Sequence, residues 1–265
     1  MEKIKAIIFD WAGTTVDYGC FAPVNAFMSI FNNRGVKLTP QEVRGPMGML
    51  KIDHISELCK LESVRKQWMA IYGTLPTQRD VEELYQEFEP TLFSTLHNFA
   101  VPNPYVVETV KILKDKGLLI GSTTGYTKEM MEIVAKEAKK NGYAPDYLIT
   151  SSEVKQGRPF PYMCERNQEF FDVKNPMFCV KVGDTVVDIK EGKNAGMWAV
   201  GIIMGSSELG VSFDEANELS AEELQNLKKK VIAKYKAAGA DYIIEDIREL
   251  PKVIEEIDKK IHCGV

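Results

Sequence analysis

Chemically active side chains recur where the predicted strands of this chain end. The apolar run Ala6–Phe9 reads as a buried strand, and Asp10 follows it directly, before a small polar turn at 13–15. Open α/β sheets bind their ligands at the carboxyl ends of their strands, so such residues are expected to meet there. The residues that end or follow the other predicted strands are Thr123, Thr124, Arg158, Asp184 and Asp188.

Together these residue types suit phosphoryl transfer through an aspartyl intermediate. The Asp10 carboxylate would be the nucleophile that attacks phosphorus. Thr124 and Arg158 would hold the non-bridging oxygens and balance their charge. Asp184 and Asp188 supply carboxylates for Mg²⁺, which lets the phosphoryl group and the attacking carboxylate approach each other. Taken singly, each of these residues is just as consistent with an ordinary turn or surface position.

Two kinds of segment must position these residues. Residues 1–19 and 99–265 alternate strand and helix patterns, which predicts an α/β fold with a Rossmann-like, doubly wound parallel sheet as its core. Residues 20–98 show one helical pattern after another and no convincing strand. We therefore predict an all-α cap domain inserted into the core.

Composition excludes several classes of function. The 265 residues carry a formal net charge of −5 without a long basic stretch, so no nucleic-acid partner is expected. No apolar run approaches the length of a membrane span, and the first residues lack the apolar region of a signal peptide. The five cysteines are scattered and form no CxxC pair, which indicates neither a disulfide framework nor a zinc site. A reducing, cytoplasmic location is the expectation.

The strand-end motifs resemble those of the haloacid dehalogenase superfamily. The resemblance implies that Asp10 is both nucleophile and metal ligand, that Asp184 binds Mg²⁺, and that Asp188 binds or supports it. One position departs from the pattern. Phosphatases of this superfamily carry an acid two residues after the nucleophile, where this chain has Ala12. Ala12 can offer its backbone carbonyl to the metal, but it has no proton for a leaving alcohol.

The missing acid leaves two interpretations, an impaired phosphatase or a leaving group that needs no acid. Lys51 favours the second, because an amine can condense with an aldehyde and form an iminium, which is an electron sink. It follows the glycine-flanked break at 45–48 and begins a predicted helix, with His54 three residues later on the same face. His54 is then a candidate proton shuttle. The competing interpretations are that Lys51 is an ordinary solvated charge and that His54 has only a structural role.

Nearly the whole chain resembles one family of the superfamily, the phosphonatases. The resemblance implies cleavage of the P–C bond of phosphonoacetaldehyde to acetaldehyde and phosphate, with Lys51 as the Schiff-base residue. It places Cys20, Met47, His54 and Tyr126 around this small phosphonate substrate. The alternatives are a phosphomonoesterase or phosphomutase of the same superfamily, and a non-catalytic sensor of phosphorylated ligands. The matching stretches are 8–23, 46–54, 121–127, 157–161, 182–185 and 205–210.

The same resemblance implies a homodimer formed through the cap domains. An apolar stripe within 21–33 would suit such an interface, and an internal cap core would explain it equally well. The stripe consists of Val24, Phe27, Met28 and Phe31.

Overall fold

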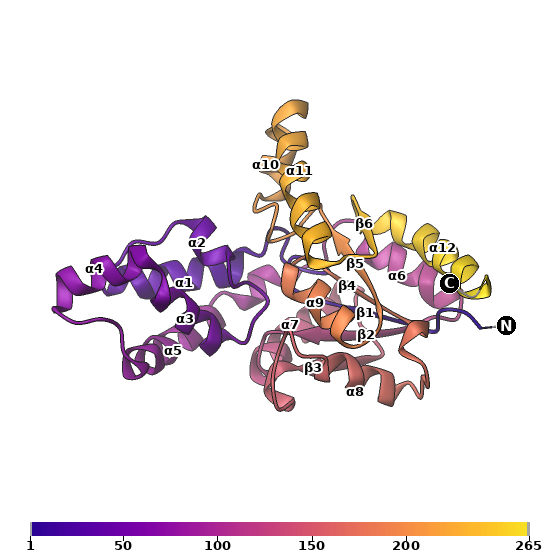
Figure 1. Ribbon diagram of the computed structural model, residues 1–265, viewed down its shortest axis with the longest axis horizontal. Coiled ribbons are helices and arrows are strands. Elements are labelled where there is room, and N and C mark those ends of the chain that lie inside the picture. Colours follow the sequence, from indigo (N-terminus) through magenta and orange to yellow (C-terminus); the bar gives the residue numbers. More distant parts are fainter. Residues whose placement is uncertain (1, 264–265) are drawn as a thin grey trace.

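The computed structural model describes residues 2–263. Within them, six strands form one parallel sheet in the order β3-β2-β1-β4-β5-β6, with β1, the strand that ends at Asp10, near its middle (Figure 1). This sheet confirms the predicted α/β fold class. The strands are β1 (Ala6–Phe9), β2 (Leu119–Thr124), β3 (Tyr147–Thr150), β4 (Cys179–Gly183), β5 (Trp198–Ile202) and β6 (Tyr242–Ile244).

Helices cover both faces of the sheet. Successive side chains of β1 alternate between the two sides, as a pleated strand requires. Ala6 and Ile8 pack in a cluster with Cys164 of α8, whereas Ile7 and Phe9 belong to the large cluster that includes α6 and α12. The core helices are α6 (Val106–Asp115), α7 (Lys128–Lys140), α8 (Tyr162–Phe170), α9 (Val186–Asn194), α10 (Phe213–Glu218), α11 (Ala221–Ala238) and α12 (Leu250–His262).

The cap consists of the helices between β1 and the core helix α6, and it lies to one side of the sheet (Figure 1). Capping boxes begin two of its helices: Thr39 with Glu42, and Thr77 with Asp80. These satisfy backbone N–H groups that a helix start leaves free. The helices are α1 (Phe21–Asn33), α2 (Pro40–Arg44), α3 (Lys51–Lys60), α4 (Glu62–Tyr72) and α5 (Gln78–Phe93), and the return to the core passes through the 3-10 turn Leu96–Phe99.

The apolar stripe of α1 lies largely inside the cap. Val24, Phe27 and Phe31 are buried, and the ring of Phe27 stacks on Phe88 of α5 with their centroids 4.3 Å apart. The internal interpretation of the stripe therefore accounts for these three residues, while Met28 is only partly buried. In the described part of the chain, no helix combines the length and the apolar character that crossing a membrane requires.

Candidate active site

A small cavity lies where the cap meets the carboxyl end of the sheet. It measures about 20 Å³, which is room for roughly one water molecule. Its lining brings together most of the site residues predicted from the sequence. From the core come Asp10, Ala12, Thr124, Gly125, Tyr126, Arg158 and Thr185, and from the cap and its first linker come Cys20, Met47, Gly48 and Lys51.

Asp10 is held in place from several sides. Its backbone N–H donates to Val182 O of β4 at 2.9 Å, which continues the pairing of β1 with β4 beyond the strand. One guanidinium nitrogen of Arg158, Nη2, lies 2.7 Å from the carboxylate oxygen Oδ1. Asp10 as a whole residue is 4% exposed, and it lines the cavity. The orientation of this carboxylate is therefore fixed before any substrate arrives.

Three carboxylates at this edge could hold a metal ion. One oxygen from each of Asp10, Asp184 and Asp188 lies within 4.8 Å of the others. Asp184 accepts from Thr14 Oγ1 at 2.9 Å and from the backbone N–H of Ser207 at 2.8 Å. Burial and the nearby charges of Asp10 and Asp188 raise the pKa of Asp184 well above its usual value. Such a carboxylate is favoured in its charged form only when a cation lies beside it.

The charges around this edge fit a divalent cation. Four buried carboxylates face two buried cations, Arg158 and Lys181, which leaves an excess of two negative charges. All the candidate donors are oxygens, the type that Mg²⁺ prefers. Asp188 already has cationic partners, since its Oδ1 lies 3.1 Å from Arg158 Nη1 and 3.0 Å from Lys181 Nζ. Burial raises the pKa of Asp188, but these two cations outweigh it and hold that pKa below its usual value. The four carboxylates are those of Asp10, Asp184, Asp188 and Glu191.

Lys181 and Glu191 were not predicted as site residues. Lys181 Nζ lies 3.2 Å from Glu191 Oε2 and 2.8 Å from Thr123 Oγ1, and Arg158 Nε donates to the same Glu191 oxygen at 2.9 Å. Burial and Arg158 lower the pKa of Lys181, but Asp188 and Glu191 outweigh them and raise it. A lysine between valines in a predicted buried strand was the signal that could have found this network.

Thr123 and Thr124, which both end β2, have different surroundings. Thr123 turns its hydroxyl into the network, where Arg158 Nη2 donates to it at 2.7 Å. Thr124 lines the cavity, and its Oγ1 accepts from the backbone N–H of Tyr126 at 3.1 Å. The structure thus brings the predicted hydroxyl, Thr124, to the cavity, together with the side chain of Ala12, which carries no acid.

Lys51 is the first residue of α3 and is 3% exposed. Its Nζ lies 5.0 Å from the ring centroid of Tyr126 and 5.8 Å from that of Phe27. Among the described residues, no carboxylate oxygen comes within 4.0 Å of it. Burial lowers the pKa of this amine, although Cys20 and Asp10 act in the opposite direction. The surroundings favour the neutral, nucleophilic form of the amine.

His54 lies beneath this region and does not line the cavity. Its Nε2 is 2.7 Å from Val43 O, a distance that requires Nε2 to carry the proton and donate. The ring packs on Phe27 with centroids 4.0 Å apart, and Nδ1 is buried without a hydrogen-bond partner in the described structure. Burial and Lys51 lower the pKa of His54 well below its usual value, so the ring is neutral. Its role as a proton shuttle stays a prediction.

Glycines allow the cap loop to rest directly on the core. A Cβ on Gly125 would lie 2.7 Å from Met49 O and 2.9 Å from Gly48 O. Gly48 itself has φ +89°, and a Cβ there would lie 2.9 Å from Thr185 Oγ1. The cap loop carrying Met47 therefore reaches the cavity through close contacts that a side chain at Gly48 or Gly125 would block.

Comparisons with known proteins agree with this architecture. The model of the haloacid dehalogenase-like hydrolases matches residues 4–196. A phosphonoacetaldehyde hydrolase of Bacillus cytotoxicus is 53% identical over 258 residues, covering 97% of this chain and 98% of the relative. This chain therefore belongs to the haloacid dehalogenase-like hydrolases and, within them, to the phosphonoacetaldehyde hydrolase family.

Two further comparisons concern length and shape. The chain is 53% identical over 259 residues to the bifunctional phosphonoacetaldehyde hydrolase/aminoethylphosphonate transaminase of Clostridioides difficile. It spans only 41% of that relative's length. The crystal structure of a phosphonoacetaldehyde hydrolase-like protein from Oleispira antarctica superposes with a TM-score of 0.97 at 33% identity, covering 100% of this chain and 96% of that one. The agreement with that structure includes the cap.

Proposed function

We propose that this chain hydrolyses the P–C bond of phosphonoacetaldehyde to acetaldehyde and phosphate. The observation that carries the proposal is a single cavity lined by an amine from the cap, Lys51, and a carboxylate from the core, Asp10. The names of its relatives support the same substrate. Ala12 disfavours the alternative of a phosphomonoesterase, because no side chain at that position can protonate an alcohol.

The first step belongs to Lys51. Its neutral amine attacks the aldehyde carbon, water leaves, and the imine nitrogen takes up one proton, so that a protonated imine joins the substrate to Nζ. A buried amine with a lowered pKa is suited to this step, because the neutral fraction is larger than in solvent. The protonated imine then withdraws electrons from the neighbouring P–C bond.

The second step belongs to Asp10. Its carboxylate attacks phosphorus in line with the P–C bond, and the bonding pair moves into the imine to give a neutral enamine. The enamine takes a proton on carbon, and water releases acetaldehyde from Lys51. Another water hydrolyses the aspartyl phosphate and restores Asp10. No alkoxide departs when the P–C bond breaks, so this step needs no acid at position 12, where a phosphatase has one.

We propose Mg²⁺ as the cofactor, held by Asp10, Asp184 and the carbonyl of Ala12, with Asp188 beside it. When bound, it would neutralise the charge that separates an anionic substrate from an anionic nucleophile. Thr124 and Arg158 are proposed to bind the phosphonate oxygens. Cys20, Met47 and Tyr126 are proposed to surround the aldehyde end, because all three line the cavity beside Lys51. His54 is proposed as a proton carrier, through its free Nδ1.

Substrate entry requires the cap to move. A cavity of about 20 Å³ holds roughly one water and cannot admit a phosphonate. We infer that the structure is the closed arrangement and that the cap, residues 20–98, opens against the core, residues 1–19 and 99–265. Closure would exclude bulk water until the P–C bond has broken.

We also propose a cytoplasmic homodimer that associates through the caps. The five cysteines are free thiols, which suits a reducing compartment. Because Val24, Phe27 and Phe31 are buried within the cap, the interface would use the outer face of α1, where Met28 lies. Sedimentation of the protein and of a Met28→Glu variant tests this. We expect the wild type to sediment as a dimer and Met28→Glu as a monomer. A monomeric wild type would refute the proposed dimer.

A substrate-dependent borohydride trap tests the function. Reduction in the presence of phosphonoacetaldehyde should attach the two-carbon fragment to the peptide that contains Lys51. Lys60→Arg is the matched control, because Lys60 ends the same helix and is exposed. It should keep both labelling and turnover, whereas Lys51→Arg should lose both. An unlabelled Lys51 together with an active Lys51→Arg enzyme would overturn the Schiff-base mechanism.

A further inference from the structure

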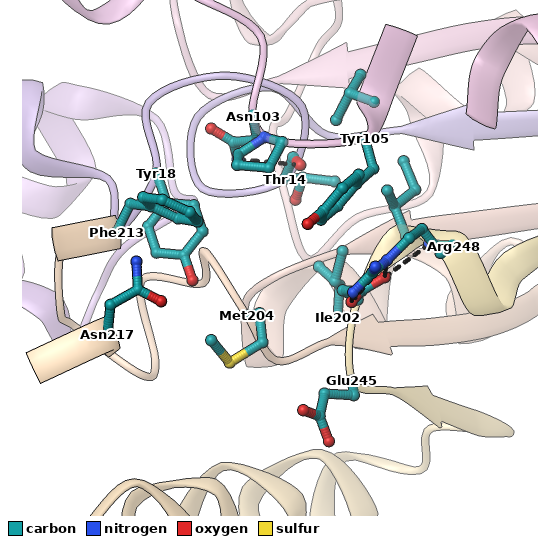
Figure 2. Close-up of a pocket in the computed structure, with 14 residues that line it drawn as sticks. Thr14, Tyr18, Asn103, Tyr105, Ile202, Met204, Phe213, Asn217, Glu245 and Arg248 are labelled. Carbon is teal, nitrogen blue, oxygen red and sulfur yellow. Dashed lines mark hydrogen bonds and ion pairs between the residues drawn. The ribbon is translucent and has the colours of Figure 1, made fainter. Parts of the chain in front are cut away.

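A larger cavity of about 210 Å³ lies beside the loop that follows Asp10. Thr14 connects it to the active site, because Thr14 lines the cavity and its hydroxyl donates to Asp184. Figure 2 shows Tyr18, Phe213 and Asn217 on one side, Tyr105 and Arg248 on the other, and Met204 between them. The mechanism proposed above uses none of these six residues.

Both connections between cap and core contribute to this cavity. Tyr18 lies on the outgoing connection, between the Asp10 loop and α1, and Asn103 and Tyr105 lie on the returning one, before α6. The two connections are tied together here, since Asn103 N donates to Thr15 O at 2.8 Å and Asn103 Nδ2 donates to Thr14 O at 3.2 Å. A molecule in this cavity would therefore touch both segments about which the cap must move.

The charged groups of the cavity are already paired. Arg248 Nε lies 2.9 Å and 3.1 Å from the two carboxylate oxygens of Asp246. Glu245 is paired with Lys228 at 2.6 Å. Among the described residues, the lining of this cavity thus offers no unpaired cation to a phosphate or phosphonate. The occupant suited to these walls carries no net charge.

Aromatic rings and amides form the rest of the walls. The rings of Tyr18 and Phe213 meet edge to face with centroids 5.5 Å apart. Tyr105 covers the guanidinium of Arg248 at 3.9 Å and has φ +68°, a left-handed conformation that costs a bulky residue energy. Tyr105 and Phe213 are each 44% exposed, so both rings keep free area on which an occupant could stack.

We propose that this cavity binds a small, neutral, planar heteroaromatic ring and that the ring stabilises the closed cap. Aromatic walls stack on such a ring, and the amides of Asn103 and Asn217 can hydrogen-bond to its edge. A volume of about 210 Å³ corresponds to roughly seven waters, which suits one or two fused rings. Because it would contact Tyr18 and Tyr105 together, the ring favours the arrangement in which both connections are in their present places.

Ligand-detected NMR and calorimetry with adenine as the probe test the binding. Saturable binding is expected, unaffected by inorganic phosphate, and weaker for adenosine 5′-monophosphate. Phe213→Ala should reduce the affinity about fivefold or more, because stacking on one ring contributes that much. Phe170→Ala removes another exposed ring, 58% exposed and outside the cavity, and should leave the affinity unchanged. No binding, displacement by phosphate, tighter binding of the nucleotide, or full affinity in Phe213→Ala would each overturn the proposal.

Hydrogen exchange tests the effect on the cap. The amide of Gly19 donates to Gly205 O at 2.7 Å, and that of Asn103 donates to Thr15 O, so both report on the connections. Adenine should slow exchange at these two amides in the wild type and have no effect in Phe213→Ala. Unchanged exchange with adenine bound would refute the stabilisation of the closed cap. Neither measurement uses turnover, so failure here is distinct from failure of the proposed hydrolase activity.

Discussion

Two buried lysines lie at or beside the active site, one in the cap and one in the core, and their surroundings differ. Lys181 lies in β4 of the core, 1% exposed, with Asp188, Glu191 and Thr123 around its ammonium group. Lys51 lies in the cap, 3% exposed, beside the rings of Tyr126 and Phe27. The pKa of the first is raised and that of the second is lowered.

The difference separates two uses of a buried amine. A lysine paired with carboxylates stays charged and fixes its neighbours, which here include Arg158 and hence Asp10. A lysine without a carboxylate partner is costly to keep charged and becomes a nucleophile more readily. The reactive Lys51 of the cap is therefore expected to lower the free energy of unfolding. The paired Lys181 of the core is expected to raise it.

The largest expected effect is loss of activity in Lys51→Met. Turnover of phosphonoacetaldehyde should fall at least about 10⁴-fold, as when a covalent catalytic group is removed. The free energy of unfolding should stay the same or rise, because a buried amine with few partners is replaced by an apolar chain of similar length. Steady-state kinetics and urea unfolding measure the two quantities. A variant that is both inactive and less stable would contradict the contrast between the two lysines.

Lys181→Met should behave in the opposite way and lose stability. Removing one partner of a buried charge network leaves Asp188 and Glu191 undercompensated, which costs about 3–5 kcal/mol of the free energy of unfolding. Urea unfolding measures this loss. The double variant Lys181→Met/Glu191→Gln should recover part of it, because one uncompensated carboxylate is removed. Equal stability of single and double variants would show that the network is not coupled.

The core could be predicted from sequence because its signals are local. Asp10, Asp184 and Arg158 each follow an apolar strand, and parallel strands of one sheet must bring their ends together. The predicted helices of the cap also form, since capping boxes such as Thr39 with Glu42 act over four residues.

What the sequence could not show depends on contacts between distant segments. Glu191 meets Lys181 and Arg158 only after α9 has packed on β4, and nothing in its local pattern distinguishes it from a surface residue. The burial of His54 against Phe27 and Val43 likewise arises only when the cap has folded, so the sequence could not show it. Helix α10 could not be predicted, because its six residues, Phe213–Glu218, are too few to show a clear helical period.

A smaller effect is expected where cap and core touch. Gly125→Ala places a methyl group 2.7 Å from Met49 O, so the cap loop must shift away from the cavity. An overlap of this kind costs about 1–3 kcal/mol, which we expect as a fall of about 5–150-fold in kcat/KM with the fold intact. Gly157→Ala is the matched control, since its methyl group would meet ordinary contacts at 3.4 Å and 3.8 Å. Equal kinetics in both variants would show that the cap does not close on Gly125.

The smallest effect concerns a single proton on Lys51. Its pKa in the folded state is lowered from 10.5, so between the lowered value and 10.5 the unfolded chain binds more protons than the folded one. The stability penalty from this amine is therefore complete below the lowered pKa and disappears as the pH rises to 10.5. The wild type should accordingly gain stability relative to Lys51→Met as the pH rises through this window.

Lys181 should change the pH dependence of stability in the opposite direction, so the two effects can be compared within one protein. Its raised pKa contributes stability below 10.5 that is lost only when the pH rises through the raised value. Urea unfolding of the wild type, Lys51→Met and Lys181→Met over the same pH series measures both differences. If the free energies of unfolding of the wild type and Lys51→Met differ by the same amount at every pH, Lys51 does not lie in an environment that favours its neutral form. The imine chemistry would then need another means of deprotonating the amine.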